Sequence, residues 1–192
     1  ITVIAIDEFF RMANEDKKLD EISREEKLSR MSELNDIEEC ADIIACAQLL
    51  RQQHGCTTVG LIGFCIGGMY AFKCAGSGVF DSVVSCYGMI TMPNDWAQQG
   101  QKDAIDYLQN DACSKVLAIV GGEDFGFAKD DDVDLLRITL SNEHHKNIGS
   151  RLEIFNEAGH AFMHDPNREE YRSDDAKAAW KFAFDFLFEN KV

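Results

Sequence analysis

One short segment of the sequence places a cysteine where it would act as a nucleophile. Residues 59–68 read Val-Gly-Leu-Ile-Gly-Phe-Cys-Ile-Gly-Gly, so that Cys65 stands between Gly63 and Gly67. The apolar residues before Cys65 predict a strand and those after it a helix, which places Cys65 at the turn between them. A nucleophile on so sharp a turn takes a strained backbone conformation, and side chains at the two flanking positions would clash there. The pattern G-x-Cys-x-G therefore predicts a nucleophile elbow that carries cysteine.

The expected turn would also assist a reaction at Cys65. The helix N-terminus points at the sulfur, its dipole favours the thiolate, and the backbone N–H of Ile66 becomes an oxyanion-hole donor. The glycine spacing is not G-x-G-x-x-G, and no G-K-[ST] follows, so it supports neither a dinucleotide fold nor a phosphate-binding loop. A buried cysteine in an ordinary tight turn remains the alternative interpretation.

Two later strand ends carry the partners that such a nucleophile needs. Asp124 follows the predicted strand Lys115–Val120, and His160 follows the predicted strand Arg151–Asn156. Open α/β sheets place their sites at the carboxyl ends of strands, and the elbow architecture has the order nucleophile, acid, histidine. We therefore predict that Asp124 orients His160, and that His160 takes the proton of Cys65 and later protonates the leaving group.

Other roles for these residues remain open. Glu123 is an alternative acid, since it directly precedes Asp124. His160 and His164 stand at i and i+4, as metal ligands do, but Ala161 occupies the place of the glutamate in H-E-x-x-H and no cysteine is near. We therefore predict no metal site.

The composition excludes several classes of protein. With 34 acidic and 19 basic residues the chain of 192 residues has a net charge of −15, and no basic run offsets it, which disfavours nucleic-acid binding. No apolar run approaches the ~18 residues of a membrane span, and the opening ITVIAID lacks the features of a signal peptide. The seven cysteines form no C-x-x-C pair, and unpaired thiols in this number predict a cytoplasmic protein.

A sheet must position the residues that would do chemistry. Short apolar runs alternate with stretches of helical period, which predicts parallel strands, covered on both faces, joined by crossover helices. The predicted strands are Thr2–Ile6, Thr57–Phe64, Ser82–Tyr87, Lys115–Val120 and Arg151–Asn156. The predicted helices are Asp36–Gln53, a helix from Ile66 to a stop at Gly76–Gly78, Asp132–Ser141 and Asp174–Glu189, the last with Ser173 or Asp174 as N-cap.

Three details complete this expectation. Trp180, Phe184 and Phe188 share one face of the last helix, and His144–His145 lie in a polar loop at the solvated surface. We predict one domain over residues 1–192. Because Ile1 leads directly into a hydrophobic strand, we expect that N-terminal elements of the sheet are missing from this chain.

Several motifs together resemble the dienelactone hydrolase family of α/β-hydrolases. They are Gly63-Phe-Cys65-Ile-Gly-Gly68, Gly121-Gly-Glu-Asp124 and Ala158-Gly-His160-Ala-Phe162. The resemblance spans nearly the whole chain, because further segments are similar to the family: Val3–Asp7 followed by Phe9-Phe10-Arg11, Tyr87–Gly88, and the closing helix region with Tyr171 and Trp180.

The resemblance implies cleavage of cyclic enol-lactones of dicarboxylic acids through an acyl-cysteine intermediate, without a cofactor or metal. It makes Cys65 the nucleophile, His160 the base and Asp124 the orienting acid. The family also has further strands ahead of the first one here, which supply a second oxyanion N–H and a glutamate near the thiol. This sequence has no counterpart of that second N–H or of that glutamate, so the resemblance also implies an N-terminally incomplete domain.

The resemblance also places Arg24, Tyr87 and His164 around the substrate. Arg24 and His164 stand where the family has arginines that hold the substrate carboxylate. His164 departs from that pattern, and an imidazole holds a carboxylate less firmly than a guanidinium does. This departure leaves open a broader ester or lactone specificity.

We therefore expect an α/β fold, an α/β-hydrolase-type mainly parallel sheet with helices on both faces and without its first strands. Its function would be hydrolysis of a small ester or lactone, as a monomer or homodimer, with no nucleic acid, membrane, metal or cofactor involved. A carboxylesterase or thioesterase on the same scaffold is one alternative. A truncated or non-catalytic homologue that binds or assembles through an exposed sheet edge is another, and a redox-reactive protein with Cys65 as sensor is a third.

Overall fold

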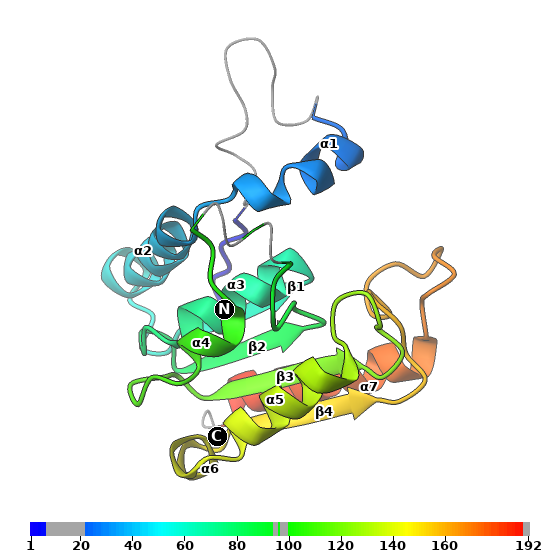
Figure 1. Ribbon diagram of the computed structural model, residues 1–192. Coiled ribbons are helices and arrows are strands. Elements are labelled where there is room, and N and C mark those ends of the chain that lie inside the picture. The colour runs from blue at the N-terminus through cyan, green and yellow to red at the C-terminus, as the bar shows by residue number, and fades with distance from the viewer. Residues whose placement is uncertain (7–21, 94–95, 97–99, 190–192) are drawn as a thin grey trace.

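Four parallel strands form the sheet in the part of the chain that the structure describes. The computed structural model describes residues 1–6, 22–93, 96 and 100–189, and for Arg24 and Leu28 it describes the backbone alone. The strands lie in the order of the chain: β1 (Gly60–Phe64), β2 (Ser82–Cys86), β3 (Val116–Gly121) and β4 (Arg151–Phe155). In Figure 1 the sheet runs from β1 at the top to β4 at the bottom, so the carboxyl ends of all four strands meet along one rim.

Helices cover both faces of this sheet. The described helices are α1 (Arg24–Ser29), the short 3-10 helix η3 (Met31–Glu33), α2 (Asp36–His54), α3 (Ile66–Ala75), α4 (Ala104–Tyr107), α5 (Asp130–Leu140), α6 (Glu143–Ile148) and α7 (Ser173–Phe188). Helices α2 to α5 share one apolar core with one face of the sheet, and α7 packs on the other face (Figure 1). The predicted fold class, a mainly parallel α/β sheet with helices on both faces, is confirmed.

Burial along the strands explains their apolar sequences. Every residue of β2 and β3 is buried, because helices cover both faces and strands flank both edges. Strand β1 lies at an edge and is only partly covered. A groove of about 780 Å³ runs along this edge, and it is lined by residues 1–4, by 54–62 and by Phe184, Leu187 and Phe188 of α7.

The predicted strand Thr2–Ile6 is wrong as a strand. A strand is defined by backbone hydrogen bonds to a neighbour, and residues 1–4 face β1 across the groove instead of pairing with it. The other four predicted strands exist: β1, β2 and β4 are slightly shorter than predicted, and β3 is shifted by one residue toward the C-terminus. The segment Phe9-Phe10-Arg11 and Asp7 lie outside the described residues.

Two predictions for the C-terminal half need correction. His144–His145 do not lie in a solvated loop but on α6, where the His145 side chain is fully buried. His145 Nε2 lies 2.8 Å from the carbonyl of Leu108 and Nδ1 lies 2.9 Å from the hydroxyl of Ser150, so tertiary partners satisfy both ring nitrogens. The N-cap of α7 is Arg172, and Ser173 is already the first helical residue.

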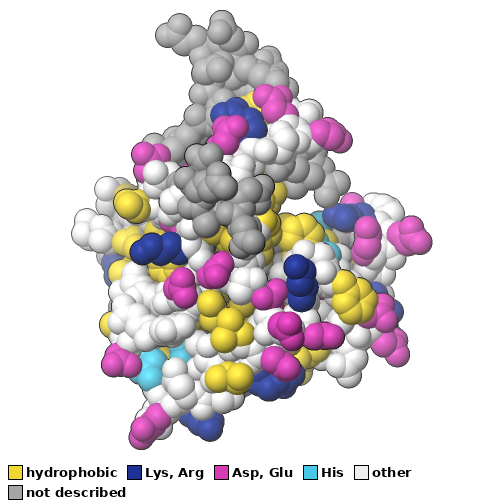
Figure 2. All heavy atoms as spheres, viewed as in Figure 1, with side chains coloured by type: hydrophobic (Ala, Val, Ile, Leu, Met, Phe, Trp, Pro, Cys, Tyr) yellow, Lys and Arg dark blue, Asp and Glu magenta, His cyan; other side chains and the backbone are white. Residues whose placement is uncertain are grey.

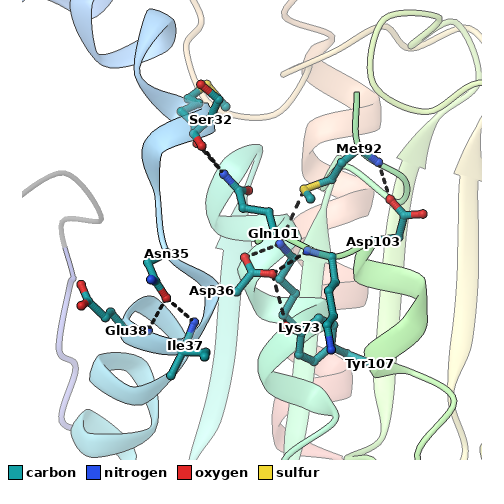
Figure 3. A network of polar contacts seen from close by, with 12 residues as sticks. Ser32, Asn35, Asp36, Ile37, Glu38, Lys73, Met92, Gln101, Asp103 and Tyr107 are labelled. Carbon is teal, nitrogen blue, oxygen red and sulfur yellow. Dashed lines mark hydrogen bonds and ion pairs between the residues drawn. The ribbon is translucent and has the colours of Figure 1, made fainter. Parts of the chain in front are cut away.

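A buried ion pair connects the helix that follows Cys65 to the rest of the domain. Lys73 on α3 lies 2.6 Å from Asp36, the first residue of α2, and both side chains are almost fully buried (Figure 3). The second oxygen of Asp36 accepts the backbone N–H of Lys102 at 2.9 Å and the hydroxyl of Tyr107 at 3.2 Å. The carboxylate is therefore fully bonded, as a buried charge requires, and it anchors α3 to α2 and to α4.

The surface carries the net negative charge that the composition demands. Figure 2 shows acidic side chains spread over one face of the molecule, with fewer basic ones between them. Of the helices in the described ranges, none is long and apolar enough to cross a bilayer.

Candidate active site

Cys65 occupies the sharp turn between β1 and α3. Its backbone has φ 54° and ψ −116°, a region that non-glycine residues rarely adopt. Its N–H donates to the carbonyl of Cys86 on β2 at 3.0 Å, which holds the turn against the sheet. A side chain at Gly63 would come within 2.0 Å of the carbonyl oxygen of Gly67, so the close approach requires glycine there. The predicted strand, turn and helix are therefore all present.

The start of α3 points backbone donors toward the thiol. The first intrahelical hydrogen bond runs from Met69 N–H to the carbonyl of Cys65 at 3.0 Å. The N–H of Ile66 precedes this bond and has no acceptor within the helix. It lies at the positive end of the helix dipole, beside the half-buried Cys65 side chain.

The ends of β3 and β4 bring Asp124 and His160 to Cys65. His160 Nδ1 lies 2.7 Å from Asp124 Oδ2, and His160 Nε2 lies 3.1 Å from Cys65 Sγ. Cys65 and His160 are 95 positions apart in the sequence, so it is the parallel sheet that brings them together. The Asp124 side chain is 1% exposed, whereas Glu123, the alternative acid, is exposed to solvent.

This environment changes the protonation of His160. Burial by itself lowers the pKa of the imidazole, but hydrogen bonds and charge interactions with Asp124 and Cys65 outweigh burial and raise the pKa to about 9. At neutral pH the ring is therefore mostly protonated. The protonated Nε2 then donates toward Cys65 Sγ at 3.1 Å.

Two aromatic rings pack against the His160 ring. Phe127 lies with its centroid 4.3 Å from that of His160 at an interplanar angle of 34°, and Tyr87 meets it edge-on at 5.3 Å. Tyr87 directly follows β2, has φ 41° and is fully buried. Tyr87 was a candidate through the family resemblance, whereas Phe127 was not predicted from the sequence.

The predicted substrate-binding residues take different places. The hydroxyl of Tyr87 lies 2.9 Å from His164 Nδ1, and His164 Nε2 lies 3.4 Å from the guanidinium of Arg168. An arginine can only donate, so Nε2 is the acceptor in the contact with Arg168. Arg168 was not anticipated from the sequence. Arg24 begins α1, and its side chain lies outside what the structure describes.

Metal ligands do not converge in this site. Across the described ranges, no three His, Cys, Asp or Glu side chains are grouped as a metal ion would require. His160 and His164, the pair with helical metal-ligand spacing, instead bond to Asp124 and Cys65 and to Tyr87, respectively.

Comparison with known proteins agrees with this geometry. The sequence profile of the Dienelactone hydrolase family matches residues 2–190. The chain belongs to this family. A search of curated protein sequences found no match to this chain.

Solved structures share its fold at low sequence identity. A carboxylesterase from Lactobacillus plantarum superposes with a TM-score of 0.59 at 12% identity over 79% of this chain and 66% of its own. An esterase from Pyrococcus furiosus gives 0.54 at 14% identity over 78% and 62%. An acylaminoacyl peptidase from Pyrococcus horikoshii gives 0.57 at 17% identity over 85% and 29%. The α/β-hydrolase-type fold is thus shown, and the chain spans less than two thirds of the length of each of these structures.

Proposed function

We propose that this dienelactone hydrolase family chain hydrolyses a small ester or lactone through an acyl-cysteine intermediate. The observation that supports it is the continuous contact of Asp124, His160 and Cys65, at 2.7 Å and 3.1 Å, on the carboxyl-terminal rim of the sheet. Nucleophile, base and orienting acid within hydrogen-bond reach are what acyl transfer needs. In the proposal no metal or cofactor takes part.

In the first half-reaction the Cys65 thiolate attacks the carbonyl carbon. A C–S bond forms, and the carbonyl electron pair moves to oxygen, where the N–H of Ile66 stabilises the oxyanion. The raised pKa of His160 means that its ring already holds the proton before attack. His160 Nε2 then gives this proton to the leaving oxygen as the C–O bond breaks. An ester leaves an acyl-cysteine and a free alcohol or enol, whereas a lactone opens to an acyl-cysteine that carries the hydroxyl or enol group in the same chain.

In the second half-reaction His160 acts as a base. Its ring is neutral after the proton transfer, so it takes a proton from a water molecule as that water attacks the thioester carbonyl. The C–S bond breaks, the carboxylic acid leaves, and the proton on His160 restores the ion pair with Cys65. Asp124 remains ionised and keeps Nδ1–H as a donor throughout.

The substrate class that we propose is an activated ester, with an enol-lactone as the family example. Cysteine suits an enol leaving group, because a good leaving group does not demand a strongly basic nucleophile. An imidazole, that of His164, in the place of a carboxylate-binding arginine favours a wider range of esters than dicarboxylic enol-lactones.

Time-resolved mass spectrometry with p-nitrophenyl acetate, and with one dienelactone, tests this function. Wild type should form a Cys65 acyl adduct that then clears, whereas Cys65→Ala should form none and Cys65→Ser should turn over slowly or not at all. Cys46→Ala on α2 is a matched control, since Cys46 is another half-buried free cysteine. The proposal would be refuted if a transient adduct also forms in Cys65→Ala. It would equally be refuted if folded wild type gives no adduct and no turnover.

One observation favours a second candidate, a binding or assembly function. Strand β1 presents an open edge, and the apolar groove beside it is lined by Phe184, Leu187 and Phe188. Edge strands pair readily with other strands, and we propose a second copy of this chain as the partner. Light scattering on size-exclusion fractions would give a homodimer if this is so, and a monomer at all concentrations would exclude it.

A further inference from the structure

The two hydrogen bonds of His160 hold its ring by the edge. They join Nδ1 to Asp124 at 2.7 Å and Nε2 to Cys65 at 3.1 Å. The ring turns about its Cα–Cβ and Cβ–Cγ bonds, and these rotations move Nε2 or swing it away from Cys65. Contacts with the faces of the ring oppose such rotations in addition to the hydrogen bonds.

The local backbone of His160 supplies little of this restraint. His160 follows Gly159, next to which a built Cβ would meet nothing within 4 Å, and it precedes Ala161 with φ 63°. The left-handed residue turns the chain back toward the sheet, where Ala161 and Phe162 are buried, while the His160 side chain remains 23% exposed. The ring therefore extends from a turn and depends on its neighbours for orientation.

One turn of the chain carries both neighbours that hold the ring. After β3 the carbonyl of Asp124 accepts the N–H of Phe127 at 3.3 Å and the N–H of Ala128 at 2.9 Å. This turn sets the carboxylate of Asp124 against the edge of the His160 ring and the phenyl ring of Phe127 against its face. Ala128 is buried, which fixes the turn to the core.

A second aromatic ring contacts His160. Tyr87 meets it edge-on at 5.3 Å between ring centroids, is fully buried, and contacts Phe162 at 5.9 Å and Phe64 at 6.1 Å. Its hydroxyl is bonded to His164. Because these neighbours hold Tyr87 in place, Tyr87 and Phe127 together limit the orientations open to the His160 ring.

We propose that Phe127 is a positioning residue of the active site, which holds the His160 ring so that Nε2 faces Cys65. This inference rests on the proposed function, because it assigns a role within the same Asp124, His160 and Cys65 site. Phe127 contacts the ring of His160, and it acts through the ring that it covers. The same short turn therefore orients the His160 ring in two ways: Asp124 forms a hydrogen bond to Nδ1, and Phe127 packs against the ring.

Kinetics on p-nitrophenyl acetate separate positioning from general stability. Phe127→Ala should lower kcat on the order of 10- to 100-fold, the range expected when a reacting group is displaced by about 1 Å, while KM stays within about twofold. Phe127→Tyr retains the ring and should restore kcat to near wild type. Phe125→Ala is the matched control, since Phe125 lies in the same turn but is 65% exposed.

A second readout does not require hydrolysis. Alkylation of Cys65 by iodoacetamide at pH 7, followed on the Cys65 peptide by mass spectrometry, reports the thiolate that a correctly placed His160 maintains. Phe127→Ala should slow it, while Phe127→Tyr and Phe125→Ala should match wild type. If wild type hydrolyses nothing but Phe127→Ala still slows alkylation, the proposed function fails and the positioning role stands. Alkylation and kcat in folded Phe127→Ala within twofold of wild type, or an equal loss in Phe125→Ala, would overturn the positioning role.

Discussion

Replacement of Asp124 by asparagine tests the electrostatics of the site most directly. The amide has the size of the carboxylate and lies in the same buried position after β3, so the backbone has no reason to move. What changes is the charge 2.7 Å from His160 Nδ1. The same amide can also present its NH₂ group to the ring and so select the wrong tautomer.

The size of the effect follows from the causes of the His160 pKa. Burial lowers that pKa, and hydrogen bonds and charge interactions with Asp124 and Cys65 raise it to about 9 against an ordinary value of 6.5. Without the Asp124 charge only the interactions with Cys65 oppose burial, so we expect the pKa to fall from about 9 toward its ordinary range. Each pKa unit of this fall corresponds to about 1.4 kcal/mol of lost preference for the imidazolium.

Two measurements follow this change in the Asp124→Asn variant. An NMR titration of the His160 ring protons should give the lowered pKa, and ester hydrolysis at pH 7 should lose about 10² to 10⁴ in kcat, the range of general acid–base catalysis. Stability should respond as well. In wild type, the stabilising contribution of protonated His160 is complete below pH 6.5 and is lost as the pH rises through about 9. The variant should lack that dependence.

Glu123→Gln is the matched control for this experiment. Glu123 is the adjacent carboxylate, but it is exposed and lies outside the contact with His160. We expect the His160 pKa of the Glu123→Gln variant to equal that of wild type, and its kcat to lie within about twofold of wild type. A His160 pKa that stays near 9 in Asp124→Asn, or a kcat loss in Glu123→Gln as large as in Asp124→Asn, would refute the assignment of Asp124 as the orienting acid.

Three further predictions concern stability and can be measured by urea unfolding. Lys73→Met should lower the free energy of unfolding by about 3–5 kcal/mol because it leaves the Asp36 carboxylate buried without its cation, and adding Asp36→Asn should recover part of that loss. Burial lowers the pKa of His145, so wild type should lose stability as the pH falls below about 6.5, and His145→Gln should show a flatter profile; identical slopes would contradict this. Gly63→Ala should cost on the order of 3 kcal/mol or prevent folding, because its Cβ would lie 2.0 Å from the Gly67 carbonyl oxygen, and a stable variant would argue against the tight elbow.

Local chemistry explains which parts of the fold were predictable. The strands β2 and β3 are mostly apolar runs, and they are buried on both faces because helices cover the sheet on both sides, as the alternating pattern predicts. The short helices α4 and α6 were not predicted, because one or two turns give too little periodicity to detect. The burial of His145 was missed for another reason. Its hydrogen-bond partners, Leu108 and Ser150, come close to it only in the folded structure, so the polar local sequence does not indicate them.

The sequence by itself determined the elbow and the order of the chemical groups. Glycines around Cys65 are required by sterics within a few residues, and Asp124 and His160 each follow a strand whose carboxyl end must reach the same rim. Only the tertiary structure decided that Asp124 rather than Glu123 faces His160, that Phe127 covers its ring, and that Arg168 meets His164. Such choices depend on the direction of a side chain across a gap of a few ångströms, which residue type and spacing leave undetermined.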